Sequence, residues 1–89
     1  MFYTYVLYSL KFHEFYIGFS SDLKRRLKEH LAGEVQSTKN RDIVLVFYEA
    51  FKSEADSRRR ELYFKTTKGK RTLQFMLKES LKIVTGPIV

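Results

Sequence analysis

Apolar positions recur at two spacings along the chain, and the shorter spacing defines three segments. FYTYVLYS (residues 2–9) and FYIGF (15–19) are rich in aromatic and β-branched residues, which favour β-strands. LKFHE (10–14) between them is polar and of hairpin length, so the two strands are predicted to pair antiparallel. IVLVFYEAF (43–51) is almost continuously apolar, which predicts a third strand that is covered on both faces and central or well packed.

Successive side chains of a β-strand point to opposite faces of the sheet, so every second residue lies on the same face. On the first strand Tyr3, Tyr5 and Leu7 share one face, and on the second strand Tyr16 and Gly18 share a face. A glycine inside a strand costs stability and often marks the close approach of another group.

The longer, helical spacing predicts a first helix that ends at about Ala32, with Gly33 just beyond its C-terminus. Ser20, Ser21 or Asp22 can cap its start. Its buried stripe is predicted to consist of Leu23, Leu27 and Leu31. Arg26 and His30, four residues apart, fall at the edge of this stripe.

A second helix is predicted from Ser53, as its cap, to about Lys65. Ala55 and Leu62 are expected to face the core. The flank of this helix is predicted to carry Arg58, Glu61 and Lys65.

TTKGK (66–70) is expected to break the chain before a last helix over about 71–83. The packing residues of that helix are predicted to be Leu73, Met76, Leu77, Leu81 and Val84. The sequence therefore predicts one α+β domain over residues 1–84, with a small three-stranded antiparallel sheet flanked by helices in the order β-β-α-β-α-α. Residues 85–89 are expected to form a loose C-terminal tail.

Composition narrows the class of protein. The 89 residues are 44% hydrophobic without any apolar run long enough to cross a bilayer, so no membrane association is expected. The absence of cysteine excludes thiol chemistry and fits a cytoplasmic location. A formal charge of +7, gathered in LKRRLK and RRRELYFKTTKGKR, favours a polyanionic partner such as nucleic acid. The alternative is a solvated charge run that only keeps the protein soluble.

The reactive side chains allow a limited chemistry. No Ser-His-Asp order, close carboxylate pair or histidine-rich metal box is present. The candidates are Tyr5, Tyr16, Arg26, His30 and Glu61. One carboxylate, several cations and groups that can move a proton suit phosphodiester cleavage, because Mg²⁺ takes few protein carboxylates and completes its coordination with water and phosphate oxygens.

Each candidate also has an ordinary structural interpretation. The two tyrosines suit a sheet, Arg26 suits a helix surface and His30 suits a hydrogen-bonded boundary position. Glu61 has the spacing of helix salt bridges with its basic neighbours.

Five ordered segments resemble the GIY-YIG nuclease superfamily over about residues 3–77. YTYVLYS stands at the position of the first motif, although it reads Tyr-Thr-Tyr in place of Gly-Ile-Tyr, and FYIG is the second motif. SSDLKRRLKEHLAG resembles the first-helix signature, STKNRDIVLVFYEAF the following loop and strand, and SEADSRRRELYFKTTKGKR the glutamate helix. The resemblance is close to small stand-alone bacterial members related to the N-terminal domain of the excision-repair nuclease subunit.

The resemblance implies a role for each matched residue. It makes Tyr5 and Tyr16 the two motif tyrosines, Arg26 the helix arginine, His30 the His/Tyr position and Glu61 the ligand of one Mg²⁺ or Mn²⁺ ion. The implied reaction is hydrolysis of a DNA strand by water, as in DNA repair, with no organic cofactor. A motif tyrosine accepts the proton of the water, helped by the His/Tyr position or by the metal ion, and the identity of the base stays open. Gly18 is expected to keep the floor of the site low.

Basic residues are expected to bind DNA phosphates without regard to sequence. They are Lys24, Arg25, Lys28, Lys39, Arg41, Lys65, Lys68 and Lys70. The repair-nuclease branch has a lysine where this chain has Phe19, so one phosphate-neutralising cation is either missing here or supplied by another element. An accessory protein or a homodimer is a possible partner besides DNA, and the alternative function is a non-catalytic nucleic-acid-binding module on the same scaffold.

Overall fold

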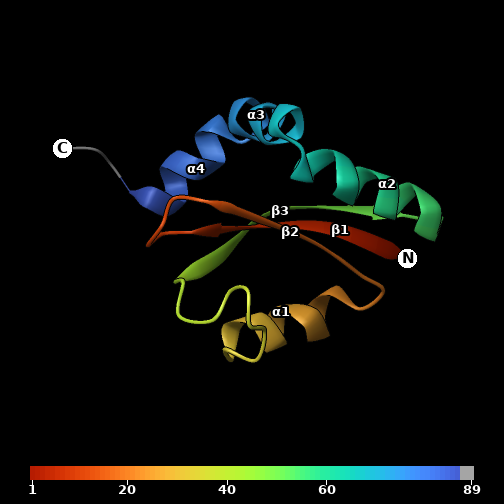
Figure 1. Ribbon diagram of the computed structural model, residues 1–89, viewed down its shortest axis with the longest axis horizontal. Helices are drawn as coiled ribbons and strands as arrows, with labels where there is room; N and C mark the ends of the chain where they lie inside the picture. The colour runs from red at the N-terminus through yellow and green to blue at the C-terminus, as the bar shows by residue number, and fades with distance from the viewer. Residues whose placement is uncertain (87–89) are drawn as a thin grey trace.

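The computed structural model describes residues 1–86, in which a three-stranded antiparallel sheet lies between helices (Figure 1). The strands are β1 (Phe2–Ser9), β2 (Phe15–Ser20) and β3 (Ile43–Phe51). The helices are α1 (Leu23–Leu31), α2 (Glu54–Lys65), α3 (Thr67–Met76) and α4 (Lys78–Thr85). The predicted α+β class is confirmed, with four helices in the order β-β-α-β-α-α-α. Of the expected C-terminal tail, residues 87–89 lie outside the described part of the chain.

The sheet has the strand order β2-β1-β3, so β1 is central and β3 is not, although Val44, Val46 and Phe47 of β3 pack against the core as the other predicted alternative requires. β1 pairs antiparallel with both neighbours, and every residue from Thr4 to Ser9 is buried. On β3, by contrast, Leu45 is 38% and Tyr48 52% exposed. The apolar run of β3 indicated a strand correctly, but hydrophobicity alone cannot say which of two apolar strands takes the centre.

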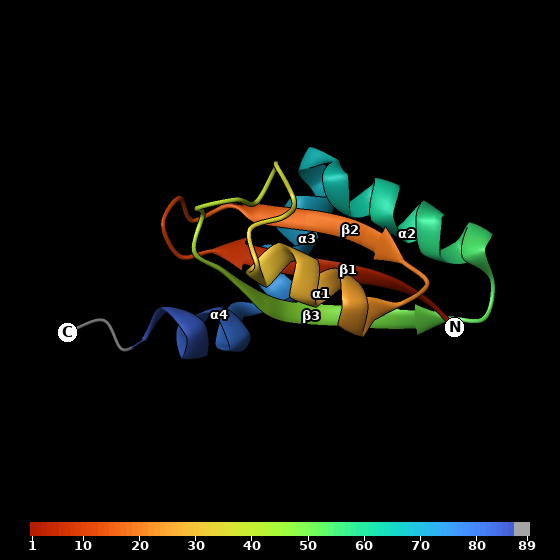
Figure 2. The ribbon, with the colours of Figure 1, turned by 90° about the horizontal axis from the view of Figure 1, so that it is seen from below.

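The helices form one layer on each face of the sheet. α1 covers one face, and α2, α3 and α4 cover the other (Figure 1). Seen from below, α1 lies across the sheet over β1 and β3 (Figure 2). No helix within residues 1–86 has the length and apolar character needed to span a membrane.

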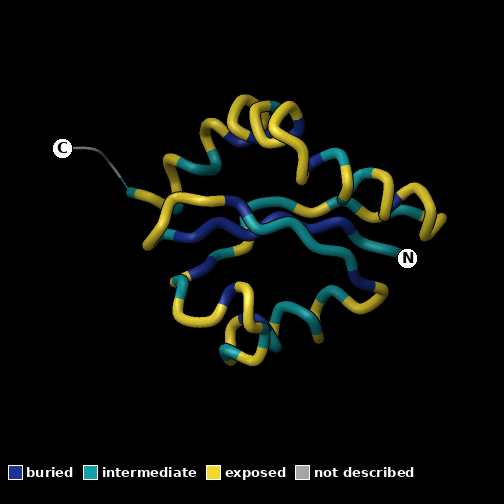
Figure 3. The backbone as a smooth tube through the Cα atoms, in the orientation of Figure 1, coloured by how far each residue is buried: buried dark blue, intermediate teal, exposed yellow. Residues whose placement is uncertain are grey.

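Two apolar clusters follow from the period-two pattern of β1. On the α1 face, Tyr5 and Leu7 pack with Ile43 of β3 and with the apolar side of α1. On the opposite face, the buried cluster comprises Val6, Tyr8, Phe15, Phe64, Leu73 and Leu77. The buried backbone therefore follows β1 through the middle of the molecule, while the outer helix surfaces are exposed (Figure 3).

The ends of α1 agree with their sequence signals. The side chain of Asp22 caps the helix by accepting from the backbone N–H of Arg25 at 3.1 Å. Gly33 follows the C-terminus with a φ of 74°, which favours glycine. Leu31, predicted to be buried, is instead 71% exposed, because His30 occupies the buried face in the last turn of the helix.

The predicted core face of α2 is wrong. Ala55 is exposed and Leu62 is 66% exposed, whereas Ser57 and Phe64 are fully buried. Phe64 packs in the core cluster, and Oγ1 of Thr4 on β1 donates to the backbone carbonyl of Ser57 at 2.6 Å. These two contacts hold this face of the helix against the sheet.

The expected break over 66–70 is confined to its first residue, because α3 already begins at Thr67. Thr66 alone separates α2 from α3, and its hydroxyl accepts from the backbone N–H of Gly69 at 2.9 Å. Gly69 is buried in α3, where an added Cβ would overlap the carbonyl oxygen of Tyr63. The glycine therefore allows two helices to approach closely rather than ending one.

The last predicted helix is interrupted at Leu77, which separates α3 from α4. Four of its five predicted packing residues do pack on the core, but Met76 is 42% exposed.

Candidate functional site

Side chains from four elements line one open cavity of about 650 Å³. β1 contributes Tyr5, β2 contributes Tyr16, α1 contributes Arg26 and His30, and α2 contributes Glu61. The structure thus brings all five candidate residues together on one concave surface, although they span more than half of the sequence.

Gly18 lies opposite Tyr5 in the β1–β2 ladder. A Cβ added to Gly18 would overlap the hydroxyl oxygen and Cζ of Tyr5, so only glycine leaves room for this ring. The space at Gly18 is filled by the Tyr5 ring, which is thereby directed towards α1.

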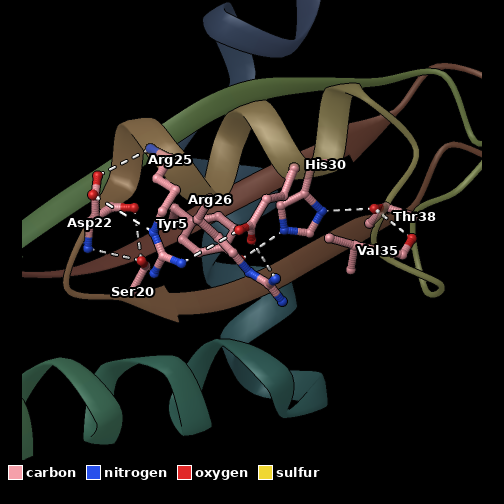
Figure 4. A network of polar contacts seen from close by, with 9 residues as sticks. Tyr5, Ser20, Asp22, Arg25, Arg26, His30, Val35 and Thr38 are labelled. Carbon is pink, nitrogen blue, oxygen red and sulfur yellow. Dashed lines mark hydrogen bonds and ion pairs between the residues drawn. The ribbon is translucent and has the colours of Figure 1, made fainter.

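Tyr5, His30 and Thr38 form a buried chain of hydrogen bonds, in which His30 lies between the other two residues (Figure 4). The Tyr5 hydroxyl lies 2.8 Å from Nε2 of His30, and Nδ1 of the same ring lies 2.7 Å from Oγ1 of Thr38. The two rings meet edge to face, with centroids 5.5 Å apart. His30 is therefore a buried group with both nitrogens bonded, not a residue at the margin of the helix stripe.

Burial controls the protonation of the groups in this chain of hydrogen bonds. It raises the pKa of Tyr5, and the neighbouring Arg26 guanidinium opposes that shift through hydrogen bonding and charge. Burial also lowers the pKa of His30, and the positive charge of Arg26 lowers it further against the opposing effect of Glu29. Both the phenol and the imidazole are consequently neutral near pH 7.

Arg26 stands on α1 beside the hydroxyl of Tyr5 (Figure 4). Its Nη1 donates to the carboxylate of Glu29 at 3.0 Å, and its side chain is 38% exposed. The hydrogen bond to Glu29 raises the pKa of the Arg26 guanidinium, which therefore stays charged. Its remaining N–H groups are able to bind an anion in the cavity.

Glu61 is held on α2 one turn after Ser57, the residue that the buried Thr4 hydroxyl ties to β1. Because Thr4 directly precedes Tyr5, this contact fixes the distance between the α2 carboxylate and the β1 phenol. The Glu61 side chain is 14% exposed, and its Oε2 accepts from Nζ of Lys65 at 2.9 Å.

Tyr16 lies towards the β2 side of the cavity and differs from Tyr5 in its surroundings. Its hydroxyl donates to Oε2 of Glu14 at 3.2 Å in an exposed contact. Partial desolvation and the hydrogen bond to Glu14 raise its pKa, and Arg41, 6.0 Å from the ring centroid, opposes this shift.

The predicted phosphate-binding residues fall into separate groups. Lys65 and Lys70 line the cavity with Glu61. Three of the predicted residues lie elsewhere on α1, where Lys24, Arg25 and Lys28 line a second groove. Arg41 stacks over Phe12, with its guanidinium carbon 4.8 Å from the ring centroid. Lys39 and Lys68 are exposed and line neither space.

Two cavity residues were missed in the sequence, and the first is Arg58. Its guanidinium carbon lies 4.0 Å from the ring centroid of Phe19, which itself stacks on Phe2 at 6.1 Å. Arg58 thus supplies a cation beside Phe19 from α2. Its spacing of three residues before Glu61 placed both on one helix flank, but the pattern alone could not distinguish a cavity cation from a surface ion pair.

The second missed residue is Thr38, in the loop between α1 and β3. It is 2% exposed and lines the cavity behind His30. Its sequence context, STKN, has the composition of an ordinary polar loop, so no residue pattern could reveal its bond to the imidazole.

Glu61 is a suitable protein ligand for a hard divalent cation. Its carboxylate lines the cavity, and carboxylate oxygens are the donors that Mg²⁺ and Mn²⁺ prefer. Within residues 1–86, no three His, Asp or Glu side chains cluster as a preformed metal cage. An open site with one carboxylate leaves coordination positions for water and phosphate oxygens.

Comparison with known proteins identifies the family. A family model described as the GIY-YIG catalytic domain matches residues 1–74. The chain is 28% identical over 88 residues to the UPF0213 protein in the ldhD 5′ region of Pediococcus acidilactici, covering 94% of this chain and 89% of that protein. It also resembles the solution structure of the UPF0213 protein BH0048 from Bacillus halodurans, with a TM-score of 0.57, 29% identity and coverage of 97% of this chain and 100% of that one. The chain belongs to the GIY-YIG family.

Proposed function

We propose that this protein is a divalent-metal-dependent endonuclease that hydrolyses a phosphodiester bond in DNA and so nicks one strand. The observation that carries the proposal is the convergence of Tyr5, Tyr16, Arg26 and Glu61, from four separate elements, on one open cavity. Membership of the GIY-YIG family supports the reaction class.

Glu61 would hold one Mg²⁺ or Mn²⁺ ion at the α2 wall of the cavity. When bound, such an ion supplies positive charge that stabilises the negative charge developing on the phosphate oxygens. Lys65, paired with Glu61 at 2.9 Å in the free protein, is long enough to turn towards a phosphate when the carboxylate is engaged.

Arg26 and Arg58 would grip the scissile phosphate from opposite elements, since one lies on α1 and the other on α2. A guanidinium offers two parallel N–H donors to phosphate oxygens, which fixes the phosphate and favours the transition state as charge builds. Arg58 lies over the Phe19 ring and pairs through Nε with Glu54 at 3.4 Å, which leaves its terminal NH₂ groups for a phosphate.

Tyr5 is the stronger candidate for the proton-accepting phenol, because its hydroxyl lies 2.8 Å from a neutral imidazole. A free phenol at neutral pH is a poor base. Tyr5 overcomes this by passing its own proton to Nε2 of His30 while its oxygen takes a proton from the attacking water.

The bond changes then balance. The water oxygen bonds to phosphorus, the bond from phosphorus to the leaving oxygen breaks, and the leaving oxygen takes a proton from solvent in the open cavity. The imidazolium of His30 then returns its proton through the Tyr5 hydroxyl to solvent, which restores both neutral groups. Arg26 stabilises the transient phenolate, since its charge already lowers the pKa of Tyr5 against the effect of burial. Tyr16, in an exposed bond to Glu14, is left to orient the water or the phosphate.

A supercoiled-plasmid nicking assay tests the proposal. We expect Mg²⁺ or Mn²⁺ to support conversion to the open circle, excess chelator to abolish it, and Arg26→Ala to lower the rate by about 10²–10³-fold while the fold survives. Arg59→Ala is the matched control, because Arg59 is an exposed α2 arginine paired only with Asp56. Nicking that is unaffected by chelation, or equal in the Arg26 variant, would contradict the proposal.

The second candidate function is a non-catalytic nucleic-acid-binding module. It is favoured by the fact that Arg26 and Glu61 each form an ion pair within their own helix. Arg26 binds Glu29 and Glu61 binds Lys65 at ordinary helix spacings, as they would on a purely structural surface. This candidate predicts salt-sensitive DNA binding without cleavage under any metal condition. A metal-dependent nick that disappears with Glu61→Gln removes it.

A further inference from the structure

Both ring nitrogens of His30 are hydrogen-bonded inside the protein. Nε2 faces the Tyr5 hydroxyl at 2.8 Å, and Nδ1 faces Oγ1 of Thr38 at 2.7 Å. Since His30 is 6% and Thr38 2% exposed, water does not compete freely for these contacts. A neutral imidazole has one N–H donor and one acceptor nitrogen, so the direction of one bond fixes the direction of the other.

One of the two possible directions leaves a proton without an acceptor. If Thr38 donated to Nδ1, the N–H at Nε2 would donate to Tyr5. The Tyr5 hydroxyl proton would then need a different acceptor, and within residues 1–86 no side chain other than His30 forms a hydrogen bond that could accept it. The adjacent Arg26 guanidinium cannot serve, because it only donates.

The opposite direction satisfies every group. Tyr5 donates to Nε2, the N–H at Nδ1 donates to Thr38, and the Thr38 hydroxyl donates to the backbone carbonyl of Val35 at 3.5 Å. The last contact is long, but the backbone N–H of Thr38 binds the same carbonyl at 3.1 Å and holds the loop turn in place. Buried polar groups in native structures adopt the arrangement in which each donor has an acceptor.

We propose that Thr38 is a positioning residue that holds His30 in its Nδ1–H tautomer and so keeps Nε2 free to accept the proton of Tyr5. Thr38 acts through the imidazole and does not itself contact the reacting phosphate. The Tyr5 phenol, the His30 imidazole and the Thr38 hydroxyl thus form an acid–base relay. In such a relay the third group fixes the tautomer of the imidazole. Its catalytic consequence rests on the proposed nuclease function, whereas the tautomer is a property of the free protein.

Nitrogen-15 NMR of the imidazole rings reads the tautomer directly. The His13→Asn variant removes the other histidine, and asparagine tolerates the φ of 57° at that exposed position. In this variant near pH 7 we expect a protonated Nδ1 and an unprotonated Nε2 for His30. A protonated Nε2 with an unprotonated Nδ1 overturns the proposal without any reference to DNA cleavage.

Two substitutions at position 38 then separate orientation from packing. Thr38→Val keeps the shape of the side chain but removes its hydroxyl. We expect the Nε2–H tautomer of His30 to gain population in this variant. We also expect kcat for nicking to fall about tenfold or more, with little change in KM. Thr38→Ser keeps the hydroxyl and should restore both readings to near the wild-type values. A folded Thr38→Val protein with an unchanged tautomer and unchanged kcat overturns the proposal.

The two hypotheses fail in different ways. A protein that shows the Nδ1–H tautomer but cleaves no DNA supports the role of Thr38 in orienting His30 and contradicts the nuclease function. A protein that cleaves DNA but holds the Nε2–H tautomer supports the nuclease function and contradicts the role of Thr38.

Discussion

The Tyr5 side chain is confined by three neighbours at the residue scale. Gly18 leaves room for its ring, His30 bonds its hydroxyl at 2.8 Å, and Arg26 acts on the same oxygen with its charge. A buried phenol in such surroundings has one well-defined position, which proton transfer requires.

Gly18→Ala should displace Tyr5. The new Cβ would overlap the Tyr5 ring, so we expect a loss of roughly 1–3 kcal/mol in the free energy of unfolding and a severe loss of nicking. Urea titration measures the first effect and the plasmid assay the second. In a Tyr5→Ala background the stability cost should largely vanish, and a cost that persists there would show that the ring is not its cause.

If His30 accepts the Tyr5 proton as proposed, its pKa sets an acid limit for nicking. Burial depresses its pKa below the ordinary 6.5, so the neutral imidazole needed as proton acceptor persists to lower pH than in a free histidine. We expect the rate of nicking to stay level down to pH 6.5 and to fall only below it. The pH dependence of kcat measures this limit, and a decline already complete at pH 7 would contradict it.

The same shift has a consequence for folding. Because the unfolded chain binds the proton more tightly, the stability contribution is fully present above pH 6.5 and is lost as the pH falls through the lower folded pKa. Urea midpoints at several pH values should therefore fall in acid more in the wild type than in His30→Gln. His13→Asn, at the exposed histidine, should leave the acid loss in place.

Some residues of the candidate site could be predicted from the sequence and others could not. Tyr5, Tyr16, Arg26 and Glu61 could be predicted because the family pattern fixes both residue type and spacing, and the structure brings them to one cavity. Thr38 could not be, since a threonine in a polar loop gives no signal until folding brings it to the imidazole. Tertiary hydrogen bonds of this kind have no local sequence pattern.

At the scale of elements, α2 depends on one buried contact for its placement. The Thr4 hydroxyl donates to the Ser57 carbonyl at 2.6 Å and lies 2.9 Å from the Ser57 hydroxyl, and neither residue is exposed. This contact sets the position of Glu61, one turn later, relative to β1.

Thr4→Val should therefore lower stability and activity together. Removing the hydroxyl leaves the Ser57 groups without their partner, which costs about 1–3 kcal/mol. We expect nicking to fall further than stability alone explains, because Glu61 would shift relative to Tyr5. Urea unfolding and the plasmid assay measure the two effects, and Thr85→Val at an exposed helix end is the control. Unchanged stability in the Thr4 variant would contradict the anchoring role.

The same contact, together with the packing of Phe64, explains why the core face of α2 was predicted wrongly. Apolar periodicity selected Ala55 and Leu62, but the face that packs carries Ser57 and Phe64. A serine reads as solvent-facing unless its buried partner is known. Existence and type of the strands and of the first two helices were predictable, whereas the central strand, the packed face of α2 and the α3–α4 break depend on tertiary contacts.

At the scale of the whole molecule, the charge of +7 is distributed over two sides. Arg26, Arg58, Lys65 and Lys70 line the cavity, while three other basic residues of α1 surround a separate groove: Lys24, Arg25 and Lys28. DNA bound at the cavity should therefore engage the α2 and α3 cations more than those of the α1 groove.

The salt dependence of DNA binding tests this division. Each lost phosphate contact should reduce the slope of log K against log salt concentration by about one. We expect Arg58→Ala to reduce it by that amount and Lys28→Ala to reduce it less, as measured by fluorescence anisotropy with a labelled duplex. Lys82→Ala on α4 is the control. A larger effect at Lys28 than at Arg58 would place the DNA on the other side of the molecule.

The most direct measurement of the central claim is the single-turnover rate of duplex cleavage as a function of Mg²⁺ concentration, in the wild type and in Glu61→Gln. If the α2 carboxylate holds the ion beside the phenol of β1, the wild-type rate rises and saturates with Mg²⁺, and the variant is slower by about 10³-fold at every concentration. Glu79→Gln, at a 77% exposed α4 carboxylate, should match the wild type. Equal saturating rates in the wild type and the Glu61 variant would contradict the assignment of this cavity as a metal-dependent nuclease site.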